Sequence, residues 1–191
     1  EVETPILQPI AGGAAARPFI THHNTLDVPL YLRIANELYL KRLIVGGKTG
    51  VYEFAKDFRN EGMDRTHNPE FTMLELYVAY KDYNWMMGFV ELIFEKLAKE
   101  VFKKTQIEYQ GTKIELKGPY QRVSFFNAIK NKTGDDISKM TIEELFQYCS
   151  VKNIETNKSM GKGKLFDAVF SEFCEKDLIQ PTYITDYPIE M

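Results

Sequence analysis

Residues 58–77 read FRNEGMDRTHNPEFTMLELY, and this stretch decides the fold prediction. Residues 51–58 before it alternate between apolar and polar side chains as a strand does, and residues 71–80 alternate in the same way. Polar residues 59–69 separate the two runs. The pattern predicts an antiparallel hairpin with a long loop, and loops of that length usually carry function.

The side chains of this hairpin suggest a chemistry. The guanidinium of Arg59 is a fork of donors that suits a phosphate or a carboxylate. Phe71 offers an aromatic face for a planar base, and Glu61 can accept hydrogen bonds from an amino group such as that of adenine. In a strand, Arg59 and Glu61 would share a face, as would Glu75 and Tyr77. The set suits ATP and a small cation, but a solvated, salt-bridged surface has the same composition.

Periodicity and turn residues predict the remaining elements. Asp82 is expected to cap a long helix, and an apolar stripe along that helix (Trp85, Phe89, Leu92, Ile93, Leu97 and Val101) is expected to be core. Thr141 and Glu144 resemble a capping box. The predicted helices are 37–45, 82–102, 124–131, 141–150 and 162–177, and the predicted strands are 2–7, 18–23, 30–34, 106–116 (a pair turning at Gly111) and 180–184.

Composition narrows the class of protein. The apolar share of 44% and the charged share of 27% are those of a globular domain, and a net charge of −3 gives no overall attraction to nucleic acid or anionic lipid. Cys149 and Cys174 have neither metal-ligand nor redox spacing, so we expect both to be buried. The sequence contains no apolar run long enough to cross a bilayer, and a cytoplasmic protein is expected.

The hairpin motif resembles a known family. FRNEG, a short gap, HNPEFT and a glutamate three residues later are similar to motif 2 of the class II aminoacyl-tRNA synthetases, in the form found in the lysyl enzymes. Asn36 departs from the pattern, since many relatives have proline there. Further similar segments are EVETPIL at 1–7 (the end of motif 1), GG at 12–13, RPF at 17–19, THHN at 21–24, LRIA at 32–35, ELYLK at 37–41, QPT at 180–182 and DYP at 186–188.

The resemblance implies a role for each motif residue. Arg59, the expected catalytic residue, would hold the α-phosphate of ATP and the carboxylate of lysine. The alternative is that Arg59 only forms an ion pair on the surface. Phe71 would stack on adenine, unless it is packed in the core. The implied ATP-binding set is Arg59, Asn60, Glu61, His67, Asn68 and Phe71.

Recognition of lysine is implied for Gly13, Glu37, Arg59, Glu75 and Tyr77. An ammonium group at each end of the substrate calls for carboxylates, and a glycine lets the backbone approach closely. The competing explanation for Glu37 is a residue that complements the dipole at a helix N-terminus.

The resemblance also implies a fold and a reaction. The expected fold is α+β: a class II synthetase-like antiparallel sheet flanked by helices, truncated, with a helical insertion. The expected division is a catalytic core part at 1–120, a helical insertion at 121–179 and a strand returning to the core at 180–191. The implied parent protein is a homodimeric lysine–tRNA ligase that uses ATP and Mg²⁺ to activate L-lysine and transfers it to tRNA(Lys).

Two expectations and two alternatives complete the prediction. Motif 3 does not occur before Met191 and the Mg²⁺ ligands are expected beyond it, so no metal site is predicted here and the 191 residues alone are expected to be inactive. One alternative is the paralogue that lysylates elongation factor P. The other is a non-catalytic scaffold.

Overall fold

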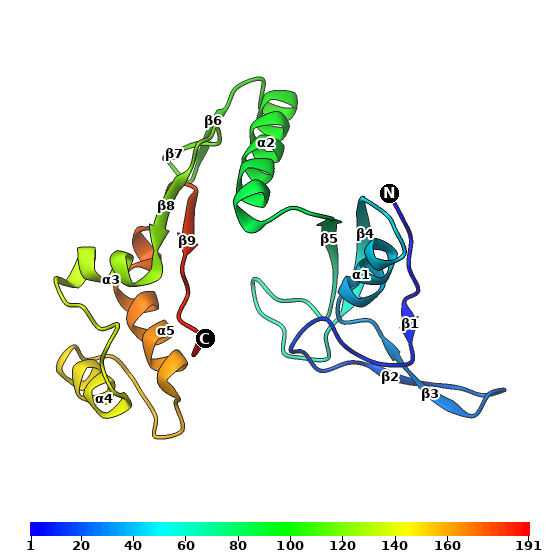
Figure 1. The fold of residues 1–191 in the computed structure, drawn as a ribbon, viewed down its shortest axis with the longest axis horizontal. Coiled ribbons are helices and arrows are strands. Elements are labelled where there is room, and N and C mark those ends of the chain that lie inside the picture. The colour runs from blue at the N-terminus through cyan, green and yellow to red at the C-terminus, as the bar shows by residue number, and fades with distance from the viewer. The chain divides into compact units, whose positions relative to one another are not determined.

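The computed structural model describes residues 1–191 and contains two compact units, residues 1–81 and 82–191, each described here by itself (Figure 1). Both contain helices and strands, which confirms the predicted mixed class at that level. The sheets are small: one three-stranded and two two-stranded antiparallel sheets, and one parallel pair. None of the helices is both long and apolar enough to span a membrane.

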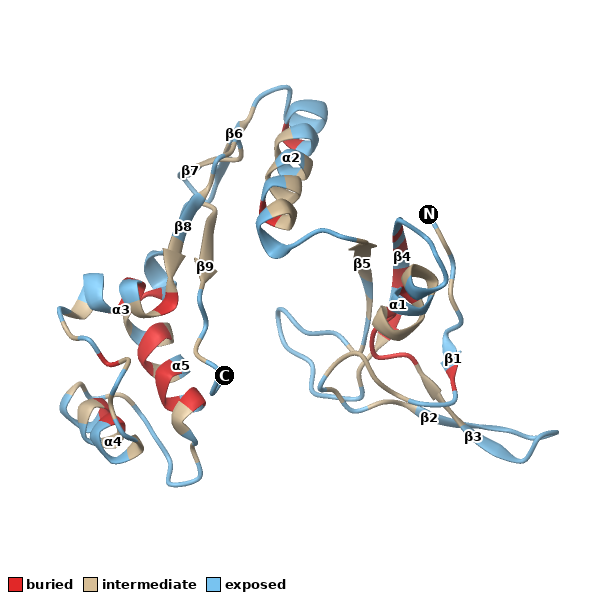
Figure 2. Cartoon of the chain, in the orientation of Figure 1, coloured by how far each residue is buried: buried red, intermediate tan, exposed pale blue.

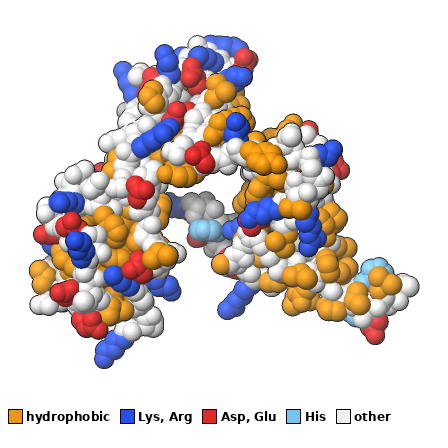
Figure 3. Space-filling model, in the orientation of Figure 1, with side chains coloured by type: hydrophobic (Ala, Val, Ile, Leu, Met, Phe, Trp, Pro, Cys, Tyr) orange, Lys and Arg blue, Asp and Glu red, His pale blue; other side chains and the backbone are white.

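A three-stranded antiparallel sheet begins the first unit. Its order is β1 (Leu7–Gln8), β3 (Val28–Leu32) and β2 (Ile20–His23). Of the extended run predicted at 2–7 and broken by Pro5, only Leu7 belongs to a strand, and Pro5 itself has no N–H to give to a ladder. At the tip of the β2–β3 hairpin, histidine and acidic side chains lie together (Figure 3), where His22 Nε2 is 3.1 Å from Asp27 Oδ1.

The hairpin predicted from residues 51–80 is confirmed. β4 (Gly50–Phe58) pairs antiparallel with β5 (Glu70–Val78) along their whole lengths, from Gly50 opposite Val78 to Phe58 opposite Glu70. Alternate residues of β4 are buried and exposed (Figure 2), and the buried ones are Val51, Glu53, Ala55 and Asp57. Helix α1 (Glu37–Val45) contacts both strands and ends at Gly46, as predicted.

The second unit starts with the long helix α2 (Tyr83–Phe102). The carboxylate of Asp82 accepts a hydrogen bond of 2.9 Å from Trp85 N, which confirms the predicted cap. The capping box of Thr141 and Glu144 is also confirmed. The other elements are β6 (Gln106–Tyr109), β7 (Thr112–Glu115), β8 (Gln121–Ser124), α3 (Phe125–Thr133), α4 (Ile142–Val151), α5 (Lys162–Phe173), the 3₁₀ turn η1 (Glu175–Asp177) and β9 (Thr182–Thr185).

The end of the chain differs from the prediction in two ways. The helix expected at 162–177 ends at Phe173, and the chain tightens into η1, a common form of helix end. Strand β9 pairs in parallel with β8, whereas a mainly antiparallel arrangement was expected. The three helices between β8 and β9 provide the long crossover that a parallel pair requires.

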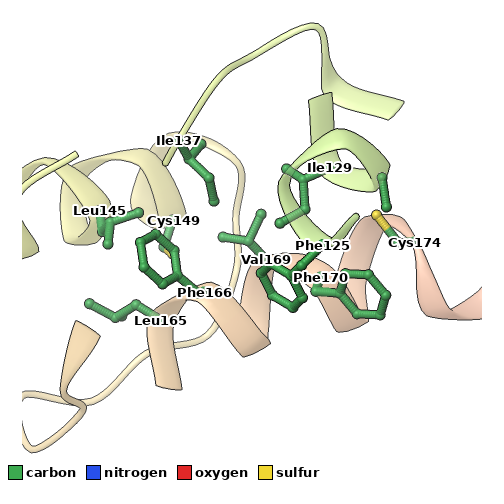
Figure 4. Close-up of a cluster of buried hydrophobic side chains, with 11 residues drawn as sticks. Phe125, Ile129, Ile137, Leu145, Cys149, Leu165, Phe166, Val169, Phe170 and Cys174 are labelled. Carbon is green, nitrogen blue, oxygen red and sulfur yellow. The ribbon is translucent and has the colours of Figure 1, made fainter. Parts of the chain in front are cut away.

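A hydrophobic core lies among α3, α4 and α5 (Figure 4). The rings of Phe125 and Phe170 stack with centroids 4.8 Å apart, and Phe166 is fully buried. Both cysteines are buried, as predicted, and burial raises the pKa of each thiol. These helices therefore share one packed interior.

The apolar stripe of α2 was predicted to be core, and for much of its length that was wrong. Leu97 is 53% exposed and Val101 65%, while only Met87 and Ala98 of this helix are buried. Periodicity identifies which face of a helix is apolar but does not identify what covers that face.

The compact units divide at residues 81 and 82. The predicted division into 1–120, 121–179 and 180–191 assigns each segment a role in a catalytic domain. The boundary at 81 and 82 is set by contacts within each unit, so it does not test that division. The division stays a prediction.

Replacing Phe166 tests the core of the second unit. Phe166→Ala should lower the free energy of unfolding by about 3–5 kcal/mol, because it removes a buried ring and leaves a cavity. Phe166→Leu, which keeps most of the volume, should cost about 1–2 kcal/mol. Urea unfolding followed by circular dichroism measures both, and equal losses in the two variants would contradict the packing described.

Candidate functional site

One face of the β4–β5 hairpin carries three carboxylates and two aromatic rings. Residues directly opposite in an antiparallel pair point to the same side. Glu53 is opposite Glu75, Asp57 is opposite Phe71, and Val51 is opposite Tyr77. We call the surface formed by Glu53, Asp57, Phe71, Glu75 and Tyr77 the acidic face of the hairpin.

A buried arginine balances part of this charge. Arg33 is 3% exposed, and its Nη1 lies 3.0 Å from Glu53 Oε1. Its Nε donates to Lys56 O at 2.9 Å and lies 3.3 Å from Asp57 Oδ1. The same Nη1 donates to Thr4 O at 3.0 Å, so one guanidinium ties the N-terminal segment to β4.

The two buried carboxylates differ in their partners. Burial acts to raise the pKa of Glu53, but hydrogen bonds from Thr4, Asn36 and Arg33 outweigh it and leave that pKa lowered. Both oxygens of Asp57 are buried without a hydrogen bond. Burial raises the pKa of Asp57 to about 6, although the nearby Arg33 opposes the shift.

Sequence reasoning had not singled out Arg33, Glu53 or Asp57. The signal was present in residues 51–58, where Glu53 and Asp57 share the strand face of Val51 and Ala55. Carboxylates in register with buried apolar residues indicate an internal cation, which is the role that Arg33 fills.

Four of the residues expected to bind lysine, Gly13, Glu37, Glu75 and Tyr77, lie together, whereas Arg59 lies beside the hairpin loop. Tyr77 Oη donates to Glu75 Oε2 at 3.0 Å, and burial together with the carboxylates of Glu75 and Glu37 raises the pKa of Tyr77. Gly13 has φ +91°, and a Cβ there would lie 3.0 Å from Glu37 Cβ. Glu37 also pairs with Lys41 Nζ at 2.7 Å, across one helical turn of α1.

The residues expected to bind ATP surround a hollow of about 440 Å³ beside the hairpin loop. The guanidinium of Arg59 lies over the ring of Phe71, 5.2 Å from its centroid, and its Nε donates to Ile34 O at 3.3 Å. Arg59 forms no ion pair in the structure, contrary to the surface-pair alternative. The lining consists of Arg59, Glu61, Gly62, Asp64, Arg65, Thr66, His67, Asn68 and Phe71.

Two details of this hollow differ from the sequence-based prediction. Asn60 does not line it, and its contribution is a backbone N–H donated to Arg17 O at 2.7 Å. Arg59 and Glu61 do not share a strand face, because β4 ends at Phe58 and both lie in the loop. They enter the same hollow through a turn, in which Glu61 N donates to Arg59 O at 2.9 Å.

Asp64 organises the tip of the loop. Its Oδ1 accepts from Thr66 N at 2.7 Å and from His67 N at 2.8 Å, and His67 Nδ1 lies 2.9 Å from both carboxylate oxygens. These donors, led by Thr66 N, hold the pKa of Asp64 well below its ordinary value. The loop is exposed but is held by its own hydrogen bonds.

Comparison with known proteins identifies the family. A family model described as tRNA synthetases class II (D, K and N) matches residues 1–191. The chain belongs to this family. Among its curated relatives is a lysine–tRNA ligase of Porphyromonas gingivalis strain W83. The two sequences are 64% identical over 191 residues, which is 100% of this chain and 33% of that protein.

Two other curated relatives are also named lysine–tRNA ligase. The identity is 63% with the protein of Christiangramia forsetii (34% of its length) and 54% with that of Azobacteroides pseudotrichonymphae (38% of its length), over 100% of this chain in each case. The chain thus spans about a third of the length of the curated relatives it matches.

The chain contains no group of three or more His, Cys, Asp or Glu side chains placed to hold a metal ion.

The buried carboxyl of Asp57 predicts a pH dependence. Its folded-state pKa of about 6 lies above the ordinary 3.8, so between these values the folded protein keeps a proton that the unfolded chain has lost. Stability should therefore fall as pH rises from about 4 to about 6. Asp57→Asn should remove the fall and be more stable than the wild type at neutral pH by about 2–3 kcal/mol. Urea unfolding at several pH values measures this, and parallel pH profiles would count against it.

Proposed function

We propose that the protein containing these residues is a lysine–tRNA ligase, which activates L-lysine with ATP and transfers it to tRNA(Lys). The observation that carries the proposal is the shared location of two sets of side chains on one hairpin. Phe71, beside the hollow, and Glu75, beside Tyr77, lie on the same strand face. Four residues of antiparallel strand separate them by about 14 Å, which leaves room for two adjoining substrates.

The nucleotide end of the hairpin supports ATP as one substrate. The ring of Phe71 already carries a flat guanidinium on its face, so a purine ring is a suitable neighbour. Arg59 is held by Ile34 O and Phe71 rather than by a carboxylate, which leaves its fork able to bind the α-phosphate and the lysine carboxylate. Glu61 would accept from the adenine amino group, and His67 and Asn68 would lie beside the distal phosphates.

The other end supports a cationic amino acid. Glu37, Glu75 and Tyr77 combine two carboxylates and a phenol. The chain's own ammonium Lys41 Nζ lies against this group, 2.7 Å from Glu37 Oε1 and 5.9 Å from the centroid of the Tyr77 ring. Groups that accept an internal ammonium suit the ammonium groups of lysine equally well.

The proposed reaction has two steps. A carboxylate oxygen of lysine attacks the α-phosphorus of ATP, the bond from that phosphorus to the bridging oxygen breaks, and pyrophosphate leaves. A ribose hydroxyl at the end of the tRNA then attacks the lysyl carbonyl, and AMP leaves. Arg59 would stabilise the charge that develops in the first step, and the other residues would position the reactants.

The proposed function also implies a fold, a cofactor, an oligomeric state and a location for the whole protein. The small sheets would be parts of a class II catalytic sheet flanked by helices, with residues 121–179 as an insertion and 180–191 returning to the sheet. Mg²⁺, a homodimer and a cytoplasmic location are proposed with it. The printed names of the relatives support tRNA, rather than elongation factor P, as the acceptor.

Arg59→Ala tests the nucleotide end in the full-length gene product. The variant should lose roughly 10²- to 10³-fold in kcat for lysine-dependent ATP–pyrophosphate exchange, because a donor to the developing charge is removed. Arg42→Ala is the matched control, since Arg42 also lies over an aromatic ring, that of Tyr39 at 5.0 Å, but outside the hollow. Equal activity in both variants would refute the role given to Arg59.

Glu75→Gln tests the lysine end. The KM for lysine should rise roughly tenfold to a hundredfold, because a charge-assisted hydrogen bond to the substrate is lost, while the KM for ATP should stay unchanged. Glu70→Gln on the same strand is the control, since Glu70 lies on the opposite face. Steady-state exchange kinetics separate the two constants, and a change confined to ATP would overturn the assignment.

A further inference from the structure

We propose that Asp64 is a positioning residue that fixes the tautomer of His67, so that ATP binding in the hollow is coupled to proton uptake by that imidazole. The inference rests on the proposed function, since it takes ATP as the ligand. It goes further by giving a role to Asp64, which the sequence motif did not assign. It also predicts that His67 takes up a proton when ATP binds, a step that the proposed reaction does not require.

The contacts of Asp64 fix its charge and its orientation. Two backbone N–H groups and the hydroxyl of Thr66 donate to Oδ1, so the carboxylate is held in place and remains an acceptor. His67 Nδ1 lies 2.9 Å from each carboxylate oxygen and 3.1 Å from Thr66 Oγ1. The imidazole is therefore attached to the loop through Nδ1.

This attachment determines where the ring proton lies. An ionised carboxylate has no proton to give, so Nδ1 must carry the hydrogen of the bond to Asp64. A neutral His67 then has its lone pair at Nε2. The phosphate oxygens of ATP are acceptors as well, so a lone pair facing them would be repelled. Nε2 can bind phosphate only after it takes up a proton.

Two arginines and two carboxylates line the hollow around His67. Arg59 and Arg65 supply the positive charge that an anionic ligand would meet there. Asp64 and Glu61 are the carboxylates on the same lining. A bound triphosphate neutralises the two arginines, and the carboxylate of Asp64 stabilises the imidazolium from the other side. Binding of ATP therefore favours protonation of His67.

Calorimetry of the full-length protein with ATP alone tests the coupling. Titrations near neutral pH in buffers of different ionisation enthalpy give the number of protons taken up. The variants are Asp64→Asn and His67→Gln. Asp64→Asn keeps an acceptor for Thr66 N and His67 N, so the loop can still form, but it removes the charge. The ionisation of ATP itself contributes equally to all proteins, so differences from the wild type isolate His67.

The matched control is Asp82→Asn. Asp82 is also exposed and also accepts from a backbone N–H three residues later, at 2.9 Å from Trp85 N, but no histidine contacts it. It should behave as the wild type does. Asp64→Asn should take up fewer protons and bind ATP roughly two- to fivefold more weakly, the effect of an exposed ion pair, with the KM for lysine unchanged.

Nitrogen NMR of labelled histidine provides the second readout, with the His67 signal assigned by its loss in His67→Gln. A neutral ring protonated at Nδ1 in the free protein supports the inference, and protonation at Nε2 overturns it. Equal proton uptake in the wild type and Asp64→Asn also overturns it. Absence of lysine-dependent pyrophosphate exchange in the wild type would instead overturn the proposed function.

Discussion

The hydrogen-bonded ion pair between Arg33 and Glu53 is the interaction on which the first unit depends. Glu53 and Asp57 are buried on the acidic face, and a buried carboxylate without a cation is very costly. Arg33 supplies the cation and, through Thr4 O and Lys56 O, also joins two segments of backbone. Its own C=O accepts from Phe58 N at 2.8 Å, so the link extends to the end of β4.

This link fixes the position of both ends of the candidate site. Ile34, which follows Arg33, provides the carbonyl that holds Arg59. Asn36 donates from Nδ2 to Glu53 Oε2 at 3.2 Å, and the next residue, Glu37, begins α1. One buried charge cluster thus positions Arg59 and Glu37, the guanidinium proposed for the nucleotide and a carboxylate proposed for the amino acid. The rest of the nucleotide lining lies on a loop, which its own hydrogen bonds must order.

Sequence reasoning succeeded where the controlling interactions are local. The Asp82 cap and the Thr141–Glu144 box each depend on residues three positions apart, and the hairpin joins two strands that follow each other in the sequence; all three were predicted. It failed where distant contacts decide, as in the exposed stripe of α2 and the parallel partner of β9. In the site, the motif predicted which residues gather but not the buried arginine beneath them. The roles of those residues stay predictions.

Gly13 sets a limit on how this amino-acid pocket can change. A side chain there would be strained by the left-handed backbone and crowded by Glu37 Cβ and Ala35 Cβ. In the proposed lysine site, that wall is therefore set by the backbone rather than by an exchangeable side chain. Redesign toward unnatural amino acids has to proceed from the strand side, where Tyr77 is only half-buried and its ring can be exchanged without strain on the backbone.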